Sequence, residues 1–241
     1  MSVLTLKLAA VAAMLADHIG HLYPALSFAP SLRIAGRLAL PVFAFLIAEG
    51  YRHTRDVRRY ALRLLTLAVL SEIPFDLLRT VNAPSPLWID YTRQNVFFTL
   101  LLGLLAVWAI DRNTKLHRPA LGWMAAAALA VLADQMQADF GAFGVAVIVI
   151  FFVFRGDRLA TAAAFCLALA VRFVLSSGML GLSGSALSTP ALMSLAAALA
   201  LPLIFAHNGK KGYRGAAMQW GFYLFYPLHM AALVALKMAL G

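Results

Sequence analysis

The stretch LTLKLAAVAAMLADHIGHLYPAL, residues Leu4–Leu26, decides the fold class. At about 1.5 Å per helical residue it is long enough to cross a hydrocarbon core of about 30 Å. Asp17 and His18 stand side by side about two-thirds of the way along it. Burying an unpaired charge in hydrocarbon is costly, so such residues usually face a polar interior. The pair is therefore a candidate for chemistry as well as for helix packing.

The rest of the chain has the composition of a membrane protein. Its 241 residues are 63% hydrophobic and only 12% charged, with a mean hydropathy of +0.83. Long apolar segments separated by short polar ones satisfy their backbone hydrogen bonds in a bilayer as helices. We therefore expect an all-α, polytopic transmembrane helical bundle that forms one integral membrane domain over residues 1–241. The single Cys166 excludes an intramolecular disulfide and is interpreted as a packed residue.

The hydropathy pattern predicts about nine membrane spans. These are Leu4–Leu26, Leu32–Tyr51, Val57–Thr80, Asn95–Ile110, Leu121–Ala133, Gly141–Phe154, Leu159–Leu175, Pro190–Ala206 and Gln219–Leu240. The fifth and sixth are short for a full crossing, so the number is open by one. Ser176–Thr189 is expected to be a Gly/Ser-rich outer loop.

Basic residues occupy alternate connections between these spans. They are Arg52, Arg55, Arg58 and Arg59, then Arg112, Lys115 and Arg118, then Arg155 and Arg158, and finally Lys210, Lys211 and Arg214. Because cytoplasmic loops of membrane proteins are enriched in Lys and Arg, this alternation places the N-terminus in the cytoplasm and the C-terminus outside. The net charge of +10 is then mainly a topology signal, and nucleic acid is not expected as a partner.

Polar residues of the spans gather in the outer half of the predicted membrane. His18 falls within about 20° of Lys7 on the first helix, which gives that helix one polar flank. Further members are Arg33 and Arg37, Glu72 and Asp76, Arg93 with Asn95, Asp134 and Asp139, and Arg172, with His229 near mid-membrane. The simplest interpretation is a polar chamber that opens outward above His229. Ordinary ion pairs between helices, interfacial arginines and solvated loop carboxylates are the structural alternative.

Common catalytic and metal motifs are absent. The sequence has no P-loop, no His-Glu-x-x-His pair and no Gly-x-Ser-x-Gly turn. Asp17, His18 and His21 lie close enough on one helix to bracket a metal, but no further ligand accompanies them. We therefore expect no metal.

An ordered set of short motifs resembles the TraX protein family over nearly the whole chain. The motifs are Lys7-x9-Asp17-His18-Ile19-Gly20, Gly36-Arg37 followed by Pro41, Phe43 and Phe45, Glu49-Gly50-Tyr51 with Thr54, Ser71-Glu72-Ile73-Pro74-Phe75, Gln94-Asn95-Val96 with Thr99, Asp139-Phe140-Gly141 with Phe143-Gly144, and Tyr226-Pro227-Leu228-His229. The namesake of that family N-acetylates the amino terminus of conjugative pilin. The resemblance implies an acetyl-CoA-dependent acyltransferase in the bacterial inner membrane.

The resemblance also implies roles for particular residues. Acetyl-CoA from the cytoplasm is expected to bind through its phosphates to Arg52, Arg55, Arg58 and Arg59, with Glu49 and Lys7 as further cofactor-binding candidates. His18 is the expected general base, with Asp17 orienting it; His229 is the alternative base, and Arg37 and Asn95 are candidate oxyanion donors. Glu72, Asp134 and Asp139 are expected to bind the acceptor from the outer side. Because His18 and Asp17 are about 100° apart around the helix, Arg37 or Lys7 is an equally reasonable partner for Asp17.

The acceptor and the function class stay open. The chain begins close to its first span and carries the Glu49-Gly50-Tyr51 and Ser71-Glu72 motifs, which are typical of chromosomal relatives. A sugar hydroxyl, an envelope polymer and a peptide amine are therefore all candidate acceptors. The alternatives to an enzyme are a non-enzymatic transporter and an assembly subunit of the cell envelope. For an assembly subunit, we expect His18→Ala and His229→Ala to be silent.

Overall fold

The computed structural model describes residues 1–83, 88–176, 195–210 and 216–240, and every regular element among them is a helix. The all-helical prediction is therefore confirmed. The chain forms two compact units, each built from segments far apart in the sequence: unit 1 is Met1–Phe45 with Val153–Tyr213, and unit 2 is Leu46–Phe152 with Arg214–Gly241. That the chain is a single membrane domain stays a prediction. Most of the expected outer loop Ser176–Thr189, the start of the segment Pro190–Ala206, and the cations Lys211 and Arg214 lie outside the described residues.

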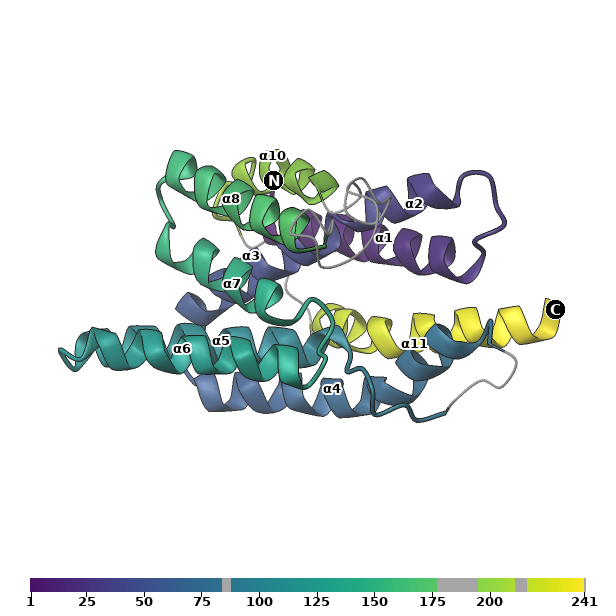
Figure 1. The fold of residues 1–241 in the computed structure, drawn as a ribbon, viewed down its shortest axis with the longest axis horizontal. Helices are drawn as coiled ribbons and strands as arrows, with labels where there is room; N and C mark the ends of the chain where they lie inside the picture. Colours follow the sequence, from purple (N-terminus) through teal and green to yellow (C-terminus); the bar gives the residue numbers. More distant parts are fainter. Residues whose placement is uncertain (84–87, 177–194, 211–215, 241) are drawn as a thin grey trace. The chain divides into compact units, whose positions relative to one another are not determined.

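Unit 1 is organised around a close pair of helices. It contains α1 (Val3–Leu22), α2 (Ala29–Gly36), the first half of α3 (Ala39–His53), α8 (Arg158–Ser176), the 3₁₀ helix η1 (Ala196–Leu199) and α10 (Ala200–Phe205). Helices α1 and α2 run side by side (Figure 1). Glycine makes this approach possible, because a Cβ on Gly20 would lie 2.9 Å from the carbonyl oxygen of Ala29 and a Cβ on Gly36 would collide with Asp17.

Unit 2 packs its helices around α5. It contains the second half of α3, α4 (Val57–Thr80), α5 (Val96–Lys115), α6 (Pro119–Gln135), α7 (Gly141–Val153) and α11 (Ala216–Leu240). Helix α5 packs against both α4 and α6, and α11 packs against α4 (Figure 1). The buried core between α5, α6 and α7 is rich in small residues: Leu102, Ala106, Ile110, Ala126, Ala133, Ala138 and Val145. Alanine and glycine at such positions allow membrane helices to approach closely.

The helices begin where short polar side chains cap them. Ser2, Asp56 and Asn95 each accept a hydrogen bond from a backbone N–H of the first turn of α1, α4 and α5 at 3.2, 3.0 and 3.0 Å. Such caps satisfy donors that have no partner inside the helix. The predicted bounds of the third span, Val57–Thr80, are those of α4.

Two predicted spans differ from the structure. The segment Leu32–Tyr51 was expected to be one helix, but it is divided between α2 and α3 by a turn at Arg37 and Leu38. Pro41 explains the break, because it has no N–H to donate to the carbonyl group of Arg37, four residues earlier. The described part of the segment Pro190–Ala206 is not a single α-helix either, because the 3₁₀ helix η1 leads directly into α10.

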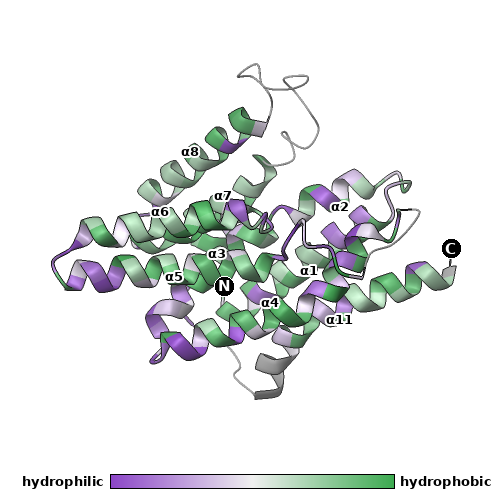
Figure 2. Ribbon diagram, turned by 60° about the horizontal axis from the view of Figure 1, so that its bottom comes forward, coloured by the Kyte–Doolittle hydropathy of each residue, from purple (hydrophilic) through white to green (hydrophobic). Residues whose placement is uncertain are grey.

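The expected number of nine spans is not confirmed. Among the described residues, five helical stretches are long and apolar enough to cross a membrane: Val3–Leu22, Ala29–His53, Val96–Lys115, Arg158–Ser176 and Gly221–Ala239. Figure 2 shows how apolar residues dominate the helices, whereas hydrophilic residues mark the connection between α5 and α6. Helices of this length and hydropathy are those of a membrane protein.

Candidate functional site

In unit 1, Asp17 forms an ion pair with Arg37. The Nη2 atom of Arg37 lies 2.5 Å from Oδ1 of Asp17, and Nε of Arg37 donates a hydrogen bond of 3.2 Å to the carbonyl oxygen of Arg33. The two paired side chains are only 19% and 22% exposed. Of the partners that the sequence left open for Asp17, which were His18, Arg37 and Lys7, Arg37 is the one that pairs with it. The pair joins α1 to the turn between α2 and α3. It lies next to Gly36, whose lack of a Cβ leaves room for Asp17.

Helix α1 carries three further ionisable residues. His18, Lys7 and His21 are all half-buried, and each takes part in a further contact. None of the three is an isolated group. Arg172 of α8 is half-buried as well.

In unit 2, the fully buried Asn95 connects α5 to α4. Its Nδ2 group donates a hydrogen bond of 2.7 Å to the carbonyl oxygen of Ala68 and another to Glu72. Its backbone N–H also donates to Oε1 of Glu72 at 3.0 Å, while its Oδ1 caps α5 at the N–H of Phe97. Both N–H bonds of the side-chain amide are thus used within the protein. In this conformation Asn95 has no side-chain donor left for the oxyanion role that the sequence predicted.

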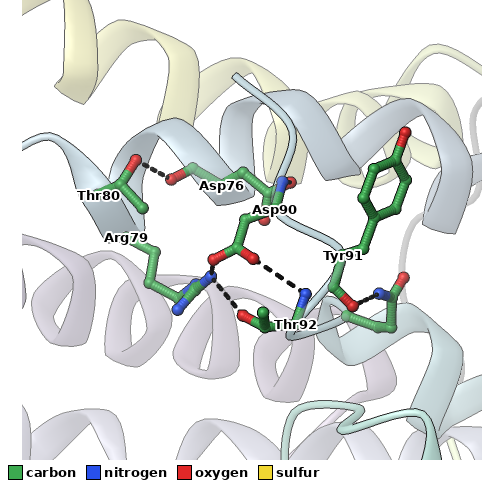
Figure 3. Close-up of polar contacts among 7 residues, drawn as sticks. Asp76, Arg79, Thr80, Asp90, Tyr91 and Thr92 are labelled. Carbon is green, nitrogen blue, oxygen red and sulfur yellow. Dashed lines mark hydrogen bonds and ion pairs between the residues drawn. The ribbon is translucent and has the colours of Figure 1, made fainter. Parts of the chain in front are cut away.

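A second group of contacts continues from α4 into the segment before α5 (Figure 3). The buried Asp76 accepts a hydrogen bond of 2.7 Å from the backbone N–H of Asp90, and Asp90 forms an ion pair with Arg79. Oδ1 of Asp90 also accepts from the N–H of Thr92 at 2.9 Å. Sequence reasoning missed Asp90 and Arg79. The only signal was that Arg79 follows Asp76 by three residues on one helix, because nothing local indicates that Asp90 folds back onto them.

The turn between α6 and α7 completes this end of unit 2. The backbone N–H of Asp139 donates to the carbonyl oxygen of Gln94 at 2.8 Å, and the hydroxyl group of Thr99 donates to the carbonyl oxygen of Asp139. Oδ1 of Asp134 accepts a hydrogen bond of 2.7 Å from the N–H of Ala142. The turn contains the left-handed residues Gln137, Phe140 and Gly141, with φ of 54°, 67° and 47°. The packed surroundings hold this strained backbone in place.

The three residues predicted to bind the acceptor are therefore brought to one end of unit 2. Glu72 accepts a hydrogen bond from Asn95, and Asp134 accepts one from the start of α7. The backbone of Asp139 forms hydrogen bonds with Gln94 and Thr99. We call this set, with Asp76, Arg79 and Asp90, the acidic end of unit 2. The contacts described above join these residues to other parts of the same chain. That these residues also bind a substrate stays a prediction.

His229 is buried in α11, also in unit 2. Its Nδ1 atom lies 2.7 Å from the carbonyl oxygen of Phe225, and its ring stacks on the ring of Phe225 at a centroid distance of 4.6 Å. The neighbouring Tyr226 contacts Phe97 of α5 edge to face, at 4.9 Å between ring centroids. His229 thus belongs to an aromatic contact between α11 and α5. His18 belongs to unit 1, so the predicted chamber draws on both units and stays a prediction.

The predicted cofactor-binding arginines lie at the other end of unit 2. Arg52, Arg55, Arg58 and Arg59 are all exposed, around the connection from α3 to α4. A hydrogen bond of 2.7 Å from the hydroxyl group of Tyr51 to Asp111 joins this connection to the last turns of α5. Glu49, buried near the end of α3, pairs with His53 at 3.0 Å. Helix α5 has 20 residues and runs from Val96, next to Asn95, to Lys115. At about 1.5 Å per residue, the acidic and basic ends are therefore separated by about 30 Å.

Comparison with known proteins identifies the family. The model of the family described as TraX protein matches residues 2–237. The chain belongs to the TraX family. It is also 32% identical, over 251 aligned positions that cover 99% of this chain and 97% of the relative, to the probable fimbrial assembly protein FimC, serogroup H1, of Dichelobacter nodosus. No solved structure matches the chain.

These comparisons correct the prediction of enzymatic activity. The relative that matches this TraX-family chain from end to end is named as a fimbrial assembly protein, not as an acetyl-CoA-dependent acyltransferase. The prediction of an acetyltransferase is therefore wrong, and family membership alone shows no enzyme activity. The catalytic roles of His18, Asp17, His229, Arg37 and Asn95 depended on that activity. Acetyl-CoA binding at the arginines is untested by these findings and stays a prediction.

The pairing of Asp17 with Arg37 predicts non-additive substitutions. Breaking a buried ion pair on one side leaves an uncompensated charge, whereas removing both partners does not. We expect Asp17→Asn or Arg37→Gln to lower the free energy of unfolding by about 2 kcal/mol each, less than for a fully buried pair. The double variant should lose no more than either single one. Thermal unfolding of the purified protein in detergent measures this cycle, and strictly additive losses would show that the two residues do not interact.

Proposed function

We propose that this chain is an integral subunit of the bacterial inner membrane that assists the assembly of fimbriae. The observation that carries the proposal is the identity of 32% with a fimbrial assembly protein across 99% of this chain and 97% of the relative. The similarity extends over nearly the full length of both sequences and not over one shared module. This proposal takes up the assembly alternative that the sequence left open.

The contacts within unit 2 support a structural role for its polar residues. Carboxylates such as those of Glu72, Asp76 and Asp90, within or next to predicted spans, are the kind of groups that could line a transport path or bind a substrate. Here each accepts hydrogen bonds from the polypeptide itself, at Asn95, at the N–H of Asp90 and at the N–H of Thr92. Such contacts make a rigid framework, which is what a subunit that holds other proteins in place requires.

We further propose that the N-terminus lies in the cytoplasm and that the chain crosses the membrane about nine times. The separation within unit 2 supports this orientation. The basic connections before α4 and after α5 lie at one end of α5, and the turn between α6 and α7 lies at the other, as an alternation of inner and outer loops requires.

Deletion of the gene tests the proposed function. We expect the host to lose fimbriae from its surface while it still makes the fibre subunit, because the missing step is assembly. Electron microscopy and immunoblotting of sheared surface fractions measure both quantities. Complementation with His18→Ala should restore the fimbriae, since no catalytic base is needed. Normal fimbriation of the deletion strain would refute the proposal, and so would a His18→Ala variant that is present at normal levels but inactive.

Labelling of single cysteines tests the orientation. In a Cys166→Ser background, Arg93→Cys and Gln137→Cys place thiols at exposed positions of the acidic end, and Arg118→Cys places one at the basic end. A membrane-impermeant maleimide should label the first two in intact spheroplasts. The third should react only after permeabilisation. The reverse pattern would place the N-terminus outside.

A further inference from the structure

The basic end of unit 2 carries a surface of guanidinium groups. We define the basic surface as Arg52, Arg55, Arg58, Arg63, Arg112 and Arg118, all of which are exposed. They come from the end of α3, the connection that follows it, the first two turns of α4, the end of α5 and the residue directly before α6. Two contacts bring these segments together: the hydrogen bond from Tyr51 to Asp111, and the packing of Tyr60 on Gly50, where a Cβ would lie 2.9 Å from the Tyr60 hydroxyl.

The carboxylates near this surface are already engaged. Asp56 caps α4 and pairs with Arg59 at 3.0 Å. Asp111 accepts from Tyr51 and pairs with Lys115, each at 2.7 Å. Within the part of the chain that the structure describes, the guanidinium groups of Arg55, Arg58 and Arg118 have neither an ion pair nor a hydrogen bond. The surface therefore keeps a positive charge that its own carboxylates do not neutralise.

Aromatic side chains fix the depth at which these arginines lie. The guanidinium group of Arg112 sits 5.8 Å from the ring centroid of Trp108, and that of Arg63 sits 5.6 Å from the ring centroid of Tyr60. Trp108 is one turn before Arg112 on α5, where the apolar part of a candidate span ends. Tryptophan, tyrosine and arginine in this order are typical of the boundary between hydrocarbon and lipid headgroups. The basic surface is thus placed at headgroup depth.

We propose that the basic surface binds the phosphate groups of anionic phospholipids. Guanidinium groups are suited to this ligand, because their planar N–H bonds match phosphate oxygens in bidentate geometry. A basic cluster next to a membrane span also attracts an anionic leaflet electrostatically. The position beside Trp108 favours a lipid over a soluble phosphate, because the lipid brings its phosphate to this depth. The inference requires only that the chain is a membrane protein, and it does not depend on the proposed role in fimbrial assembly.

Fluorescence quenching by brominated lipids tests this binding. Trp88→Phe, Trp123→Phe and Trp220→Phe leave Trp108 as the only tryptophan, next to the basic surface. The protein is placed in nanodiscs of phosphatidylcholine and phosphatidylglycerol, in which one lipid at a time carries bromine at an equal mole fraction. Brominated phosphatidylglycerol should quench Trp108 more strongly, which gives a relative affinity above one. Arg55→Gln should lower that relative affinity toward one, by up to about fivefold, and rising salt should have the same effect.

Matched variants decide between a specific surface and a general charge effect. Arg55→Gln, Arg58→Gln and Arg118→Gln together should bring the relative affinity to one. Arg155→Gln, Arg158→Gln and Lys210→Gln remove the same charge from unit 1 and should leave it unchanged. Equal quenching by the two lipids in the protein with all arginines would overturn the proposal, as would an equal loss in both triple variants. Loss of the lipid preference on adding soluble coenzyme A or inorganic phosphate would also overturn it, in favour of a soluble ligand.

Discussion

The hydrogen bonds of the buried Asn95 are the constraint on which the architecture of unit 2 depends. One residue caps α5, binds the carbonyl oxygen of Ala68 and holds the carboxylate of Glu72. An amide in this position must have all its partners, since an unsatisfied buried polar group is costly. The register of α4 against α5 is therefore fixed by polar contacts at one end. The small residues of α5 and α6 then allow close packing along the rest of the helices.

The two ends of unit 2 differ in their chemistry. At the acidic end, the carboxylates of Glu72, Asp76 and Asp90 are used by the chain itself. At the basic end, carboxylates are fewer than cations, and guanidinium groups such as those of Arg55 and Arg58 remain available to an outside ligand. Polar residues in a membrane protein are therefore not equally informative about function. A polar residue whose partners all lie within the fold is expected to connect helices, whereas one without such partners is available to bind a ligand.

Much of the fold could be predicted from the sequence, because membrane helices are recognised from local composition. The bounds of α4 follow directly from the hydropathy pattern. The break at Arg37 was missed, although Pro41 supplied its physical cause. The candidate site was predicted less well, because its contacts join distant segments. The Asp17–Arg37 pair was one of three alternatives that the sequence left open, whereas the contacts of Asp90 with Arg79 and of Thr99 with Asp139 have no local pattern.

The wrong prediction of enzymatic activity shows the limit of assigning functions to residues from a family resemblance. Motifs such as Gln94-Asn95 and Ser71-Glu72 were interpreted as catalytic and substrate-binding groups, yet in the structure Asn95 and Glu72 hold each other. A motif shared with a family is compatible with a structural requirement as well as with a shared reaction. The hydrogen-bond partners of each residue separate the two explanations.

The thermal stability of Glu72→Ala is the most direct test of the claim that these polar residues serve the fold. Replacing a binding-site residue commonly leaves stability unchanged or raises it, because such sites are not optimised for stability. Removing Glu72 from the described contacts would instead leave the buried Asn95 with unsatisfied donors, at a cost of about 1–3 kcal/mol. If Glu72 stabilises the fold through Asn95, the Tm of the purified protein should decrease by about 2–10 °C. An unchanged or higher Tm would contradict it.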